Sequence, residues 1–206
     1  MGLFKGSATL SRYQVKGDMP ADFWEFVDRR IRANVFLDIE QSTEEQAVGW
    51  CSAHDFLDTT FAYAAYALDP YIVLGLRVDR RKVAASLVRK YLRLEINKAL
   101  AARGGRALSR HDREEMKEKV AFDLMRRTPP STQVFEVVWD TAKAEVWLGS
   151  SGRGVRDLFE DAFKRTFDLA LWPRLPYLLA GDLLGPGPLA ARLEEARPLS
   201  LYHAEA

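Results

Sequence analysis

Positively charged side chains are concentrated in one segment of the chain, from Arg77 to Arg127. This segment carries sixteen Lys or Arg residues against seven Asp or Glu residues, a net charge of +9. The remainder carries fourteen basic and twenty-two acidic residues, a net charge of −8, although the whole chain has a formal net charge of only +1. A positive field confined to one segment is typical of a protein that meets a polyanion, so the sequence favours nucleic acid as a partner.

In the first part of this segment, the basic residues are predicted to lie on one side of a helix. A helix is predicted over 82–102, and a step of 100° per residue places its early basic residues on one line, opposite Leu87, Tyr91 and Leu94. Such a line suits phosphate binding, which needs Lys and Arg side chains along one surface. The alternative interpretation is that the line is only a solvated face of the helix. The nine predicted phosphate contacts are Arg77, Arg80, Arg81, Lys82, Arg89, Lys90 and Arg93, with Arg126 and Arg127 as weaker candidates.

Two other classes of function compete with simple DNA binding. Asp157, Glu160 and Asp161 lie on one predicted helix, and paired carboxylates can hold Mg²⁺ for a nuclease reaction. Basic residues on the same helix explain these acids as local ion pairs, so we predict no enzyme activity. The third hypothesis is a protein-interaction module whose basic segment binds an acidic partner.

Metal or nucleophilic chemistry has little support. His54, His111 and His203 are dispersed and Cys51 is the one cysteine, so we predict no metal and no cofactor. A lone thiol beside Trp50 indicates a reduced cysteine in a cytosolic protein, and a nucleophilic role assisted by His54 is the less favoured reading. The Gly-rich loop 149–154 could touch a phosphate, but it lacks the Gly-Lys-Ser/Thr ending of a nucleotide loop.

The apolar segments favour a cytoplasmic protein without membrane contact. The N-terminal residues contain no run long enough for a signal peptide. The most apolar stretch, 169–184, is interrupted by prolines, charges and a glycine, so it is expected to be core or interface.

Periodicity predicts an α+β protein with antiparallel sheets and packed helices. Two successive sets of strand, helix and paired strands suggest two pseudo-repeated halves with a boundary near 69–70. We predict a single domain over 1–184 and a C-terminal tail over 185–206, rich in Pro and Gly and then charged, which is mobile or swapped onto a partner. One helix is predicted to begin at Pro20, with Asp18 as a plausible cap. Further helices are predicted over 82–102, over 109–127 with Ser109 as the cap, and over 155–167 with an amphipathic pattern. The predicted strands lie within 3–15, 47–52, 59–68, 71–78, 132–140 and 144–149, and the nearly continuous apolar run of 71–78 predicts a strand buried on both faces.

The order of several short passages resembles the RdgC family of bacterial recombination-associated proteins. Together these passages extend over roughly residues 3–180, and the resemblance lies in their order and composition. They are LSRYQVKG at 10–17, DFWEFV at 22–27, the Gly49-Trp50 pair, LRVDRRKVAASLVRKY at 76–91, LSRHDREEMKEKV at 108–120, the strand ending Val138-Trp139-Asp140, and LFEDAFKRTFDLAL at 158–171.

This resemblance implies a nucleoid-associated protein that binds double-stranded DNA without sequence preference. It further implies a homodimer that closes a basic ring around the duplex and limits access of the RecA recombinase to DNA. The family's basic lining would map onto the block from Arg77 to Arg93, with contributions near Arg126 and Arg127. Better-known members are longer than this chain, so an open clamp is the alternative to a closed ring, and an RNA substrate also stays open.

Overall fold

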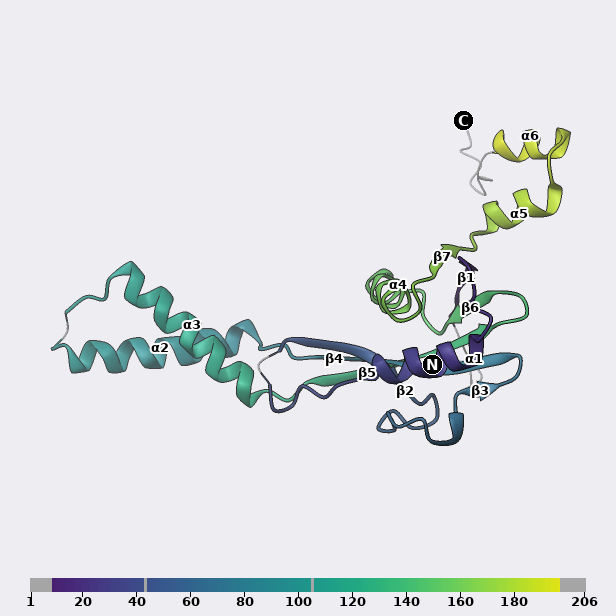
Figure 1. The fold of residues 1–206 in the computed structure, drawn as a ribbon. Helices are drawn as coiled ribbons and strands as arrows, with labels where there is room; N and C mark the ends of the chain where they lie inside the picture. Colours follow the sequence, from purple (N-terminus) through teal and green to yellow (C-terminus); the bar gives the residue numbers. More distant parts are fainter. Residues whose placement is uncertain (1–8, 43, 105, 197–206) are drawn as a thin grey trace, which may run out of the picture.

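The structure is a computed structural model that describes residues 9–42, 44–104 and 106–196. In this part of the chain, one antiparallel sheet carries helices on one face, and a helical arm projects from one end (Figure 1). The predicted α+β class is confirmed. The strands are β1 (Ser11–Lys16), β2 (Gln46–Cys51), β3 (Ala67–Leu68), β4 (Tyr71–Arg80), β5 (Ser131–Asp140), β6 (Glu145–Leu148) and β7 (Ala170–Pro173). The helices are α1 (Phe23–Ala33), the 3₁₀ helix η1 (Ala62–Ala64), α2 (Ala85–Ala102), α3 (Arg110–Arg127), α4 (Arg153–Phe167), α5 (Pro176–Leu184) and α6 (Pro188–Glu194).

The hairpin of β4 and β5 is the longest pairing in the sheet. The two strands pair from Tyr71 opposite Asp140 to Arg80 opposite Ser131. The nearly continuous apolar sequence of β4 predicted a strand buried on both faces, and residues 72–79 are indeed buried. The full sheet order is β2-β4-β5-β6-β1-β7, with β3 beside β4, so this hairpin supports both the sheet and the arm.

Helices α1 and α4 cover one face of the sheet and enclose the main core. Trp50 and Trp139 are fully buried there. The indole Nε1 of Trp50 donates a hydrogen bond to Thr166 Oγ1 of α4 at 2.7 Å, and the Trp139 ring lies 5.2 Å from the rings of Phe163 and Phe167. The predicted amphipathic helix over 155–167 is confirmed, because its apolar residues recur at the spacing that faces a sheet.

The first helix begins later than the sequence predicted. Pro20 was expected to open it with Asp18 as a plausible cap, but α1 begins at Phe23 with Asp22 in the N-cap position. Residues 21 and 22 form a turn ahead of the helix. The proline therefore restricts the approach to the helix and is not its first helical residue.

The predicted strand over 59–68 is wrong. This segment forms η1 and the two-residue strand β3, because Phe61, Tyr63 and Ala64 have positive φ angles that do not fit an extended chain. Phe61 and Tyr66 are buried against each other at 5.8 Å between ring centroids, and the Tyr66 hydroxyl donates to Asp28 of α1 at 2.8 Å. Tyr63, by contrast, is fully exposed, so aromatic content in this segment indicated neither uniform burial nor a strand.

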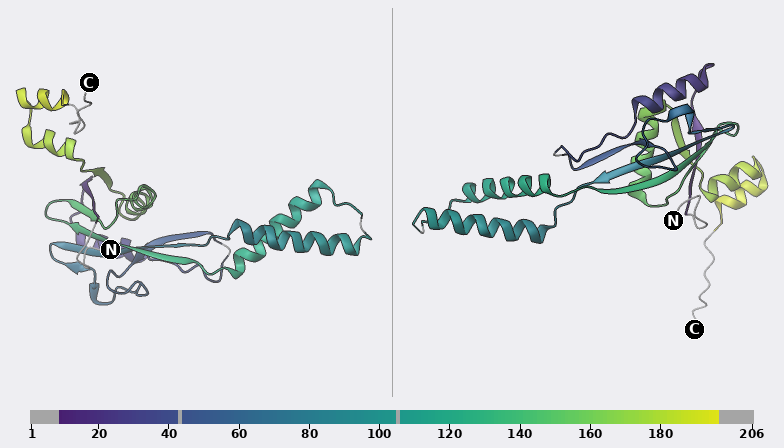
Figure 2. Two further views of the ribbon diagram at one scale, coloured as in Figure 1. Left: turned by 180° about the vertical axis from the view of Figure 1, so that it is seen from behind. Right: turned by 90° about the horizontal axis from the view of Figure 1, so that it is seen from below.

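Both halves of the chain contribute to the same sheet. Strand β1 pairs with β6 on one side and with β7 on the other, so the N-terminal strand lies among strands of the second half. The pseudo-repeat and the domain boundaries stay predictions. The predicted tail over 185–206 includes α6, which packs with α5 away from the sheet (Figure 2). Residues 3–8 of the predicted first strand and residues 197–206 of the tail lie outside the described residues.

Candidate nucleic-acid interface

The segment 81–130 forms the arm, an antiparallel helical hairpin inserted between β4 and β5. Helices α2 and α3 pack on each other, and both views show them extending beyond the end of the sheet (Figures 1 and 2). Each helix has eighteen residues, which corresponds to a length of roughly 27 Å at 1.5 Å per residue. The arm therefore presents a long surface that the sheet does not cover.

Local sequence signals place the two helices. Ser109 and Asp112 form a capping box at the start of α3, with the Ser109 hydroxyl accepting from the Asp112 amide at 3.0 Å and the Asp112 carboxylate accepting from the Ser109 amide at 3.1 Å. The hydrogen bond from the Ser109 amide, followed by that from Arg103 at 3.0 Å, lowers the pKa of Asp112. The Ser109 cap predicted from the sequence is confirmed, whereas α2 begins at Ala85 and not at Lys82.

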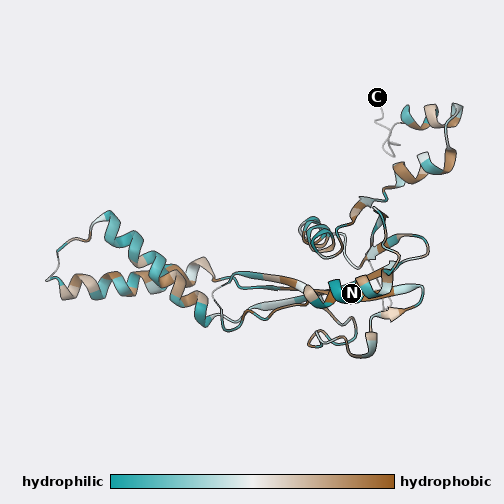
Figure 3. Ribbon diagram, viewed as in Figure 1, coloured by the Kyte–Doolittle hydropathy of each residue, from teal (hydrophilic) through white to brown (hydrophobic). Residues whose placement is uncertain are grey.

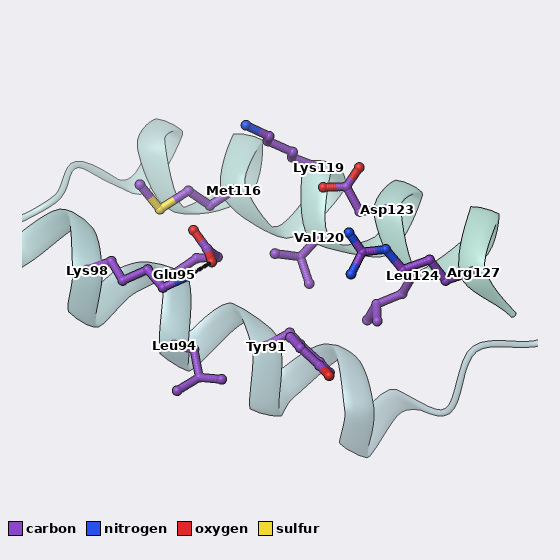
Figure 4. A pocket seen from close by; sticks show the side chains of 10 residues that line it. All are labelled: Tyr91, Leu94, Glu95, Lys98, Met116, Lys119, Val120, Asp123, Leu124 and Arg127. Carbon is purple, nitrogen blue, oxygen red and sulfur yellow. Dashed lines mark hydrogen bonds and ion pairs between the residues drawn. The ribbon is translucent and has the colours of Figure 1, made fainter.

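The seam between the helices is narrow. Val120 and Leu124 of α3 are buried, but none of residues 85–102 of α2 is. Between the helices lies an open groove of about 490 Å³, onto which Tyr91 and Leu94 of α2 project together with Met116 of α3 (Figure 4). The side predicted to be apolar thus borders the groove through Tyr91 and Leu94, and both side chains stay exposed. Hydrophilic residues predominate on α3, while α2 is mixed (Figure 3).

The antiparallel hairpin brings the two separate groups of predicted basic residues to one place. The beginning of α2 and the end of α3 meet at the root of the arm, next to the sheet (Figure 1). Seven of the nine predicted residues are exposed there, and among the described residues none of the seven forms an ion pair. We call these residues the root cluster: Arg80, Lys82, Arg89, Lys90, Arg93, Arg126 and Arg127.

Within the root cluster, two residues have contacts of their own. Arg80 Nε donates to Gln46 Oε1 at 3.0 Å, and this bond is exposed to solvent. The Lys90 ammonium lies 5.8 Å from the centre of the neighbouring Tyr91 ring. Neither contact neutralises a charge, so the cluster keeps its positive field. Lys82 precedes α2, and its predicted alignment with Arg89 on the helix surface is therefore wrong.

Arg77 does not belong to this surface, because it is buried on the face of the sheet opposite α1 and α4. Only 7% of its surface is exposed, and its guanidinium donates to both carboxylate oxygens of Asp79, at 3.0 and 2.8 Å. The pKa of Arg77 is raised, chiefly by these bonds. The guanidinium also stacks on Phe36 at 4.0 Å. Its donors are used inside the protein, so we remove Arg77 from the predicted phosphate contacts.

Arg81 is also internal. It is 4% exposed, and its guanidinium donates to the backbone oxygens of Ser42 at 2.6 Å, Ile39 at 2.8 Å and Glu40 at 3.3 Å. These bonds fix residues 39–42 beside the root of the arm. Arg81 therefore positions these residues. Because it is buried, it has little surface for the predicted phosphate contact.

The acidic residues considered for a nuclease lie on α4. Asp157 and Asp161 are exposed and Glu160 is partly buried. Among the described residues, no group of three or more His, Cys, Asp or Glu side chains is arranged to hold a metal ion.

The remaining sequence candidates have structural roles. Cys51 is buried with its thiol 3.4 Å from the Gly75 carbonyl, and burial raises the pKa of this thiol to about 12. A thiol in this state is a poor nucleophile at neutral pH. The predicted loop 149–154 is shorter in the structure, because its last two residues, Arg153 and Gly154, already belong to α4. None of the helices in the described residues is long and apolar enough to cross a membrane.

Sequence reasoning missed the groove and its position. It placed Tyr91 and Leu94 opposite the basic line, but it did not identify Met116, Val120 and Leu124 as the surface that faces them. The break at Gly104-Gly105 between two helices of equal length was the available signal, because two adjacent helices joined by a short turn usually pack antiparallel.

The fold and the root cluster together define an α+β protein that presents a basic helical arm. The comparison with known families identifies it further. A family model described as "Putative exonuclease, RdgC" matches residues 8–170, and the chain belongs to the RdgC family. This confirms the resemblance stated from the sequence, and membership points to a recombination-associated role in DNA binding at the level of the family. No curated protein matches the chain.

Proposed function

We propose that this protein binds double-stranded DNA without sequence preference through the root cluster. The observation that carries the proposal is the gathering of exposed, unpaired cations from α2 and α3 at one end of the sheet. Lys and Arg side chains on a surface neutralise phosphates of any sequence, because the backbone is the same at every base pair. Contacts made from helix surfaces to phosphates alone do not read base edges.

We propose that the working form is a homodimer that acts as a clamp. Support comes from the arm, where Tyr91 and Leu94 border a groove and Phe122 is exposed on α3. Apolar side chains left in water on an isolated arm favour association with a second copy. Two copies joined in this way would set two root clusters on either side of a duplex. Whether the clamp closes into a ring depends on a second contact between the copies.

We further propose that a bound clamp limits RecA by occupying duplex DNA in the bacterial nucleoid. This role needs occupancy of the DNA and no catalytic step, so the protein acts without nuclease activity and without a cofactor. The proposed lack of nuclease activity is tested by incubating end-labelled duplex and single-stranded DNA with the protein and Mg²⁺ or Mn²⁺. Release of labelled nucleotides that is lost with α4 carboxylate variants would contradict it.

The central experiment is a titration of fluorescent duplex DNA over a salt series, followed by anisotropy. With about six phosphate contacts, the logarithm of the affinity should fall against the logarithm of salt with a slope of about −5. The variant Arg89→Ala with Arg93→Ala should make the slope shallower by about 2 and weaken binding equally on unrelated sequences.

A matched control removes two positive charges elsewhere. Arg29 of α1 and Lys164 of α4 are exposed and lie outside the arm. The double variant Arg29→Ala with Lys164→Ala should bind nearly as the parent protein does. Equal losses in both double variants would show that only net charge matters, and an unchanged slope in the arm variant would remove the root cluster from the site. Light scattering of the free and bound protein measures the stoichiometry.

A further inference from the structure

A second surface of the molecule has the opposite charge from the arm. From residue 33 to residue 76 the sequence contains seven Asp or Glu residues and no Lys or Arg, a net charge of −7. This segment supplies most of the negative charge that offsets the basic segment, and much of it forms two loops, 37–45 and 52–61, on either side of β2. A surface of this sign repels phosphate backbones, so it does not extend the DNA site.

Exposed apolar side chains lie on the same two loops. Leu37 is 74% exposed, Leu57 is 68% exposed and Phe56 is 44% exposed. Arg77 holds their chain segments together, because its guanidinium lies 4.0 Å from the Phe36 ring and 5.6 Å from the Phe56 ring. Leu37 and Leu57 each follow one of these rings in the sequence. The apolar residues therefore sit on two loops that meet over one buried arginine.

The carboxylates beside these residues are fixed in position. Asp55 accepts a hydrogen bond from the Leu57 amide at 2.9 Å, and Asp58 accepts from the Thr60 amide and hydroxyl at 2.8 Å each. The bonds from Thr60 lower the pKa of Asp58, so this group is ionised at neutral pH. Asp38 accepts the same kind of turn bond from the Glu40 amide at 2.6 Å, and its half-exposed carboxylate also lies 3.6 Å from the Arg77 guanidinium. The negative charges are thus held next to the apolar side chains.

We propose that this surface binds a basic, amphipathic segment of another protein. The surface, called here the acidic apolar face, consists of Leu37, Phe56 and Leu57 with Asp38, Asp55 and Asp58. Apolar side chains of the partner would cover the exposed leucines and Phe56, and its Lys or Arg residues would pair with the three aspartates. This surface lies opposite α1 and α4 and is separate from the root cluster. The proposal goes beyond DNA binding and does not depend on it.

The test uses a fluorescein-labelled synthetic helix of eighteen Lys and Leu residues with all leucines on one face. A scrambled peptide of the same composition, with its leucines spread around the helix, measures attraction by charge alone. Binding is followed by anisotropy in the absence of DNA, so a failure here is distinct from a failure of DNA binding. We expect the amphipathic peptide to bind at least tenfold more tightly than the scrambled one.

Two variants locate the binding site. Leu37→Ser with Leu57→Ser removes exposed side chains and should weaken binding of the amphipathic peptide by tenfold or more, with an unchanged melting temperature. Leu183→Ser is the matched control, because Leu183 of α5 is 87% exposed and lies far from β2 in the sequence and outside the two loops. Peptide binding that is unchanged in the double variant would overturn the proposal. Equal binding of the two peptides to the parent protein would overturn it as well.

Discussion

Replacement of Arg77 by Met separates the buried basic residue from those proposed to contact DNA. Arg77 and Asp79 form a two-bond ion pair on one strand, and Asp79 is only 1% exposed. Met has a similar length and no charge, so Arg77→Met leaves the Asp79 carboxylate buried without its partner. Breaking a buried pair in this way costs about 3–5 kcal/mol of the free energy of unfolding. This is a large part of the 5–15 kcal/mol typical of a folded domain.

Urea unfolding followed by tryptophan fluorescence measures this loss, because Trp50 and Trp139 are buried in the core. A second variant, Arg77→Met with Asp79→Leu, removes both charges and should recover much of the stability, since a buried pair is often no better than apolar residues of similar volume. Asp79→Leu alone should be destabilised, because it leaves the buried arginine with only the longer ion pair to the half-exposed Asp38, at 3.6 Å. The interaction energy of the two positions follows from this cycle.

DNA binding by the folded Arg77→Met protein should retain the salt slope of the parent protein. The guanidinium is already neutralised by Asp79, and Arg77 is only 7% exposed, so no counterion release is lost. A stable Arg77→Met protein whose slope is shallower by about 1 would refute this reasoning. Arg77 would then contact a DNA phosphate directly.

Three smaller predictions concern the core and the arm. Thr166→Val leaves the buried Trp50 indole without its acceptor and should cost about 1–3 kcal/mol in urea unfolding, whereas Thr166→Ser should retain most of the stability. Because the pKa of Asp112 is lowered, the stability that its carboxylate adds to the arm is complete above the unfolded pKa, near 4, and is lost as pH falls through the lower folded pKa. The loss of helicity on going to pH 3 should therefore be smaller in Asp112→Asn than in the parent protein. Cys51, with its pKa raised to about 12, should react with iodoacetamide at pH 8 only after unfolding, and rapid labelling of the native protein would contradict its burial.

The sequence predicted most of the regular elements because local signals and burial agreed there. The apolar run of 71–78, the amphipathic pattern of 155–167 and the Ser109 cap each matched the element that formed. The segment 59–68 was misassigned because Phe61 and Tyr66 are buried against each other and beside α1, not by strand pairing, while Tyr63 is fully exposed. Phe61 and Tyr63 have positive φ angles that exclude an extended strand, and the residue types at these positions do not predict such angles.

The candidate site was only partly predictable. Charge segregation identified the arm, but sequence could not separate Arg77 and Arg81 from the exposed residues around them. Strand alternation places Arg77 opposite the main core, and a polar residue at such a position is usually exposed when one face of a sheet is open. Here the loops 37–45 and 52–61 cover that face, and their contacts with Arg77 and Arg81 depend on tertiary structure. Residues distant in the sequence therefore decide which arginines are available.

The loop fixed by Arg81 also places negative charge next to the root cluster. Glu44 and Glu45 are exposed next to the root of the arm, since the Arg81 amide donates to the Glu45 carbonyl at 2.8 Å. Their charges oppose a phosphate that approaches Lys82. The variant Glu44→Gln with Glu45→Gln should therefore bind duplex DNA more tightly than the parent protein at 0.05 M salt.

The gain should shrink as salt increases, because the screening length falls to about 10 Å at 0.1 M and to about 3 Å at 1 M. The matched control is Glu194→Gln with Glu195→Gln, which removes two exposed acids at the end of α6. An equal gain in both variants would mean that total charge alone governs binding. No gain in either variant would mean that DNA does not approach the root closely, and the phosphate contacts would then have to lie farther along the arm, towards the exposed arginines beyond Arg93.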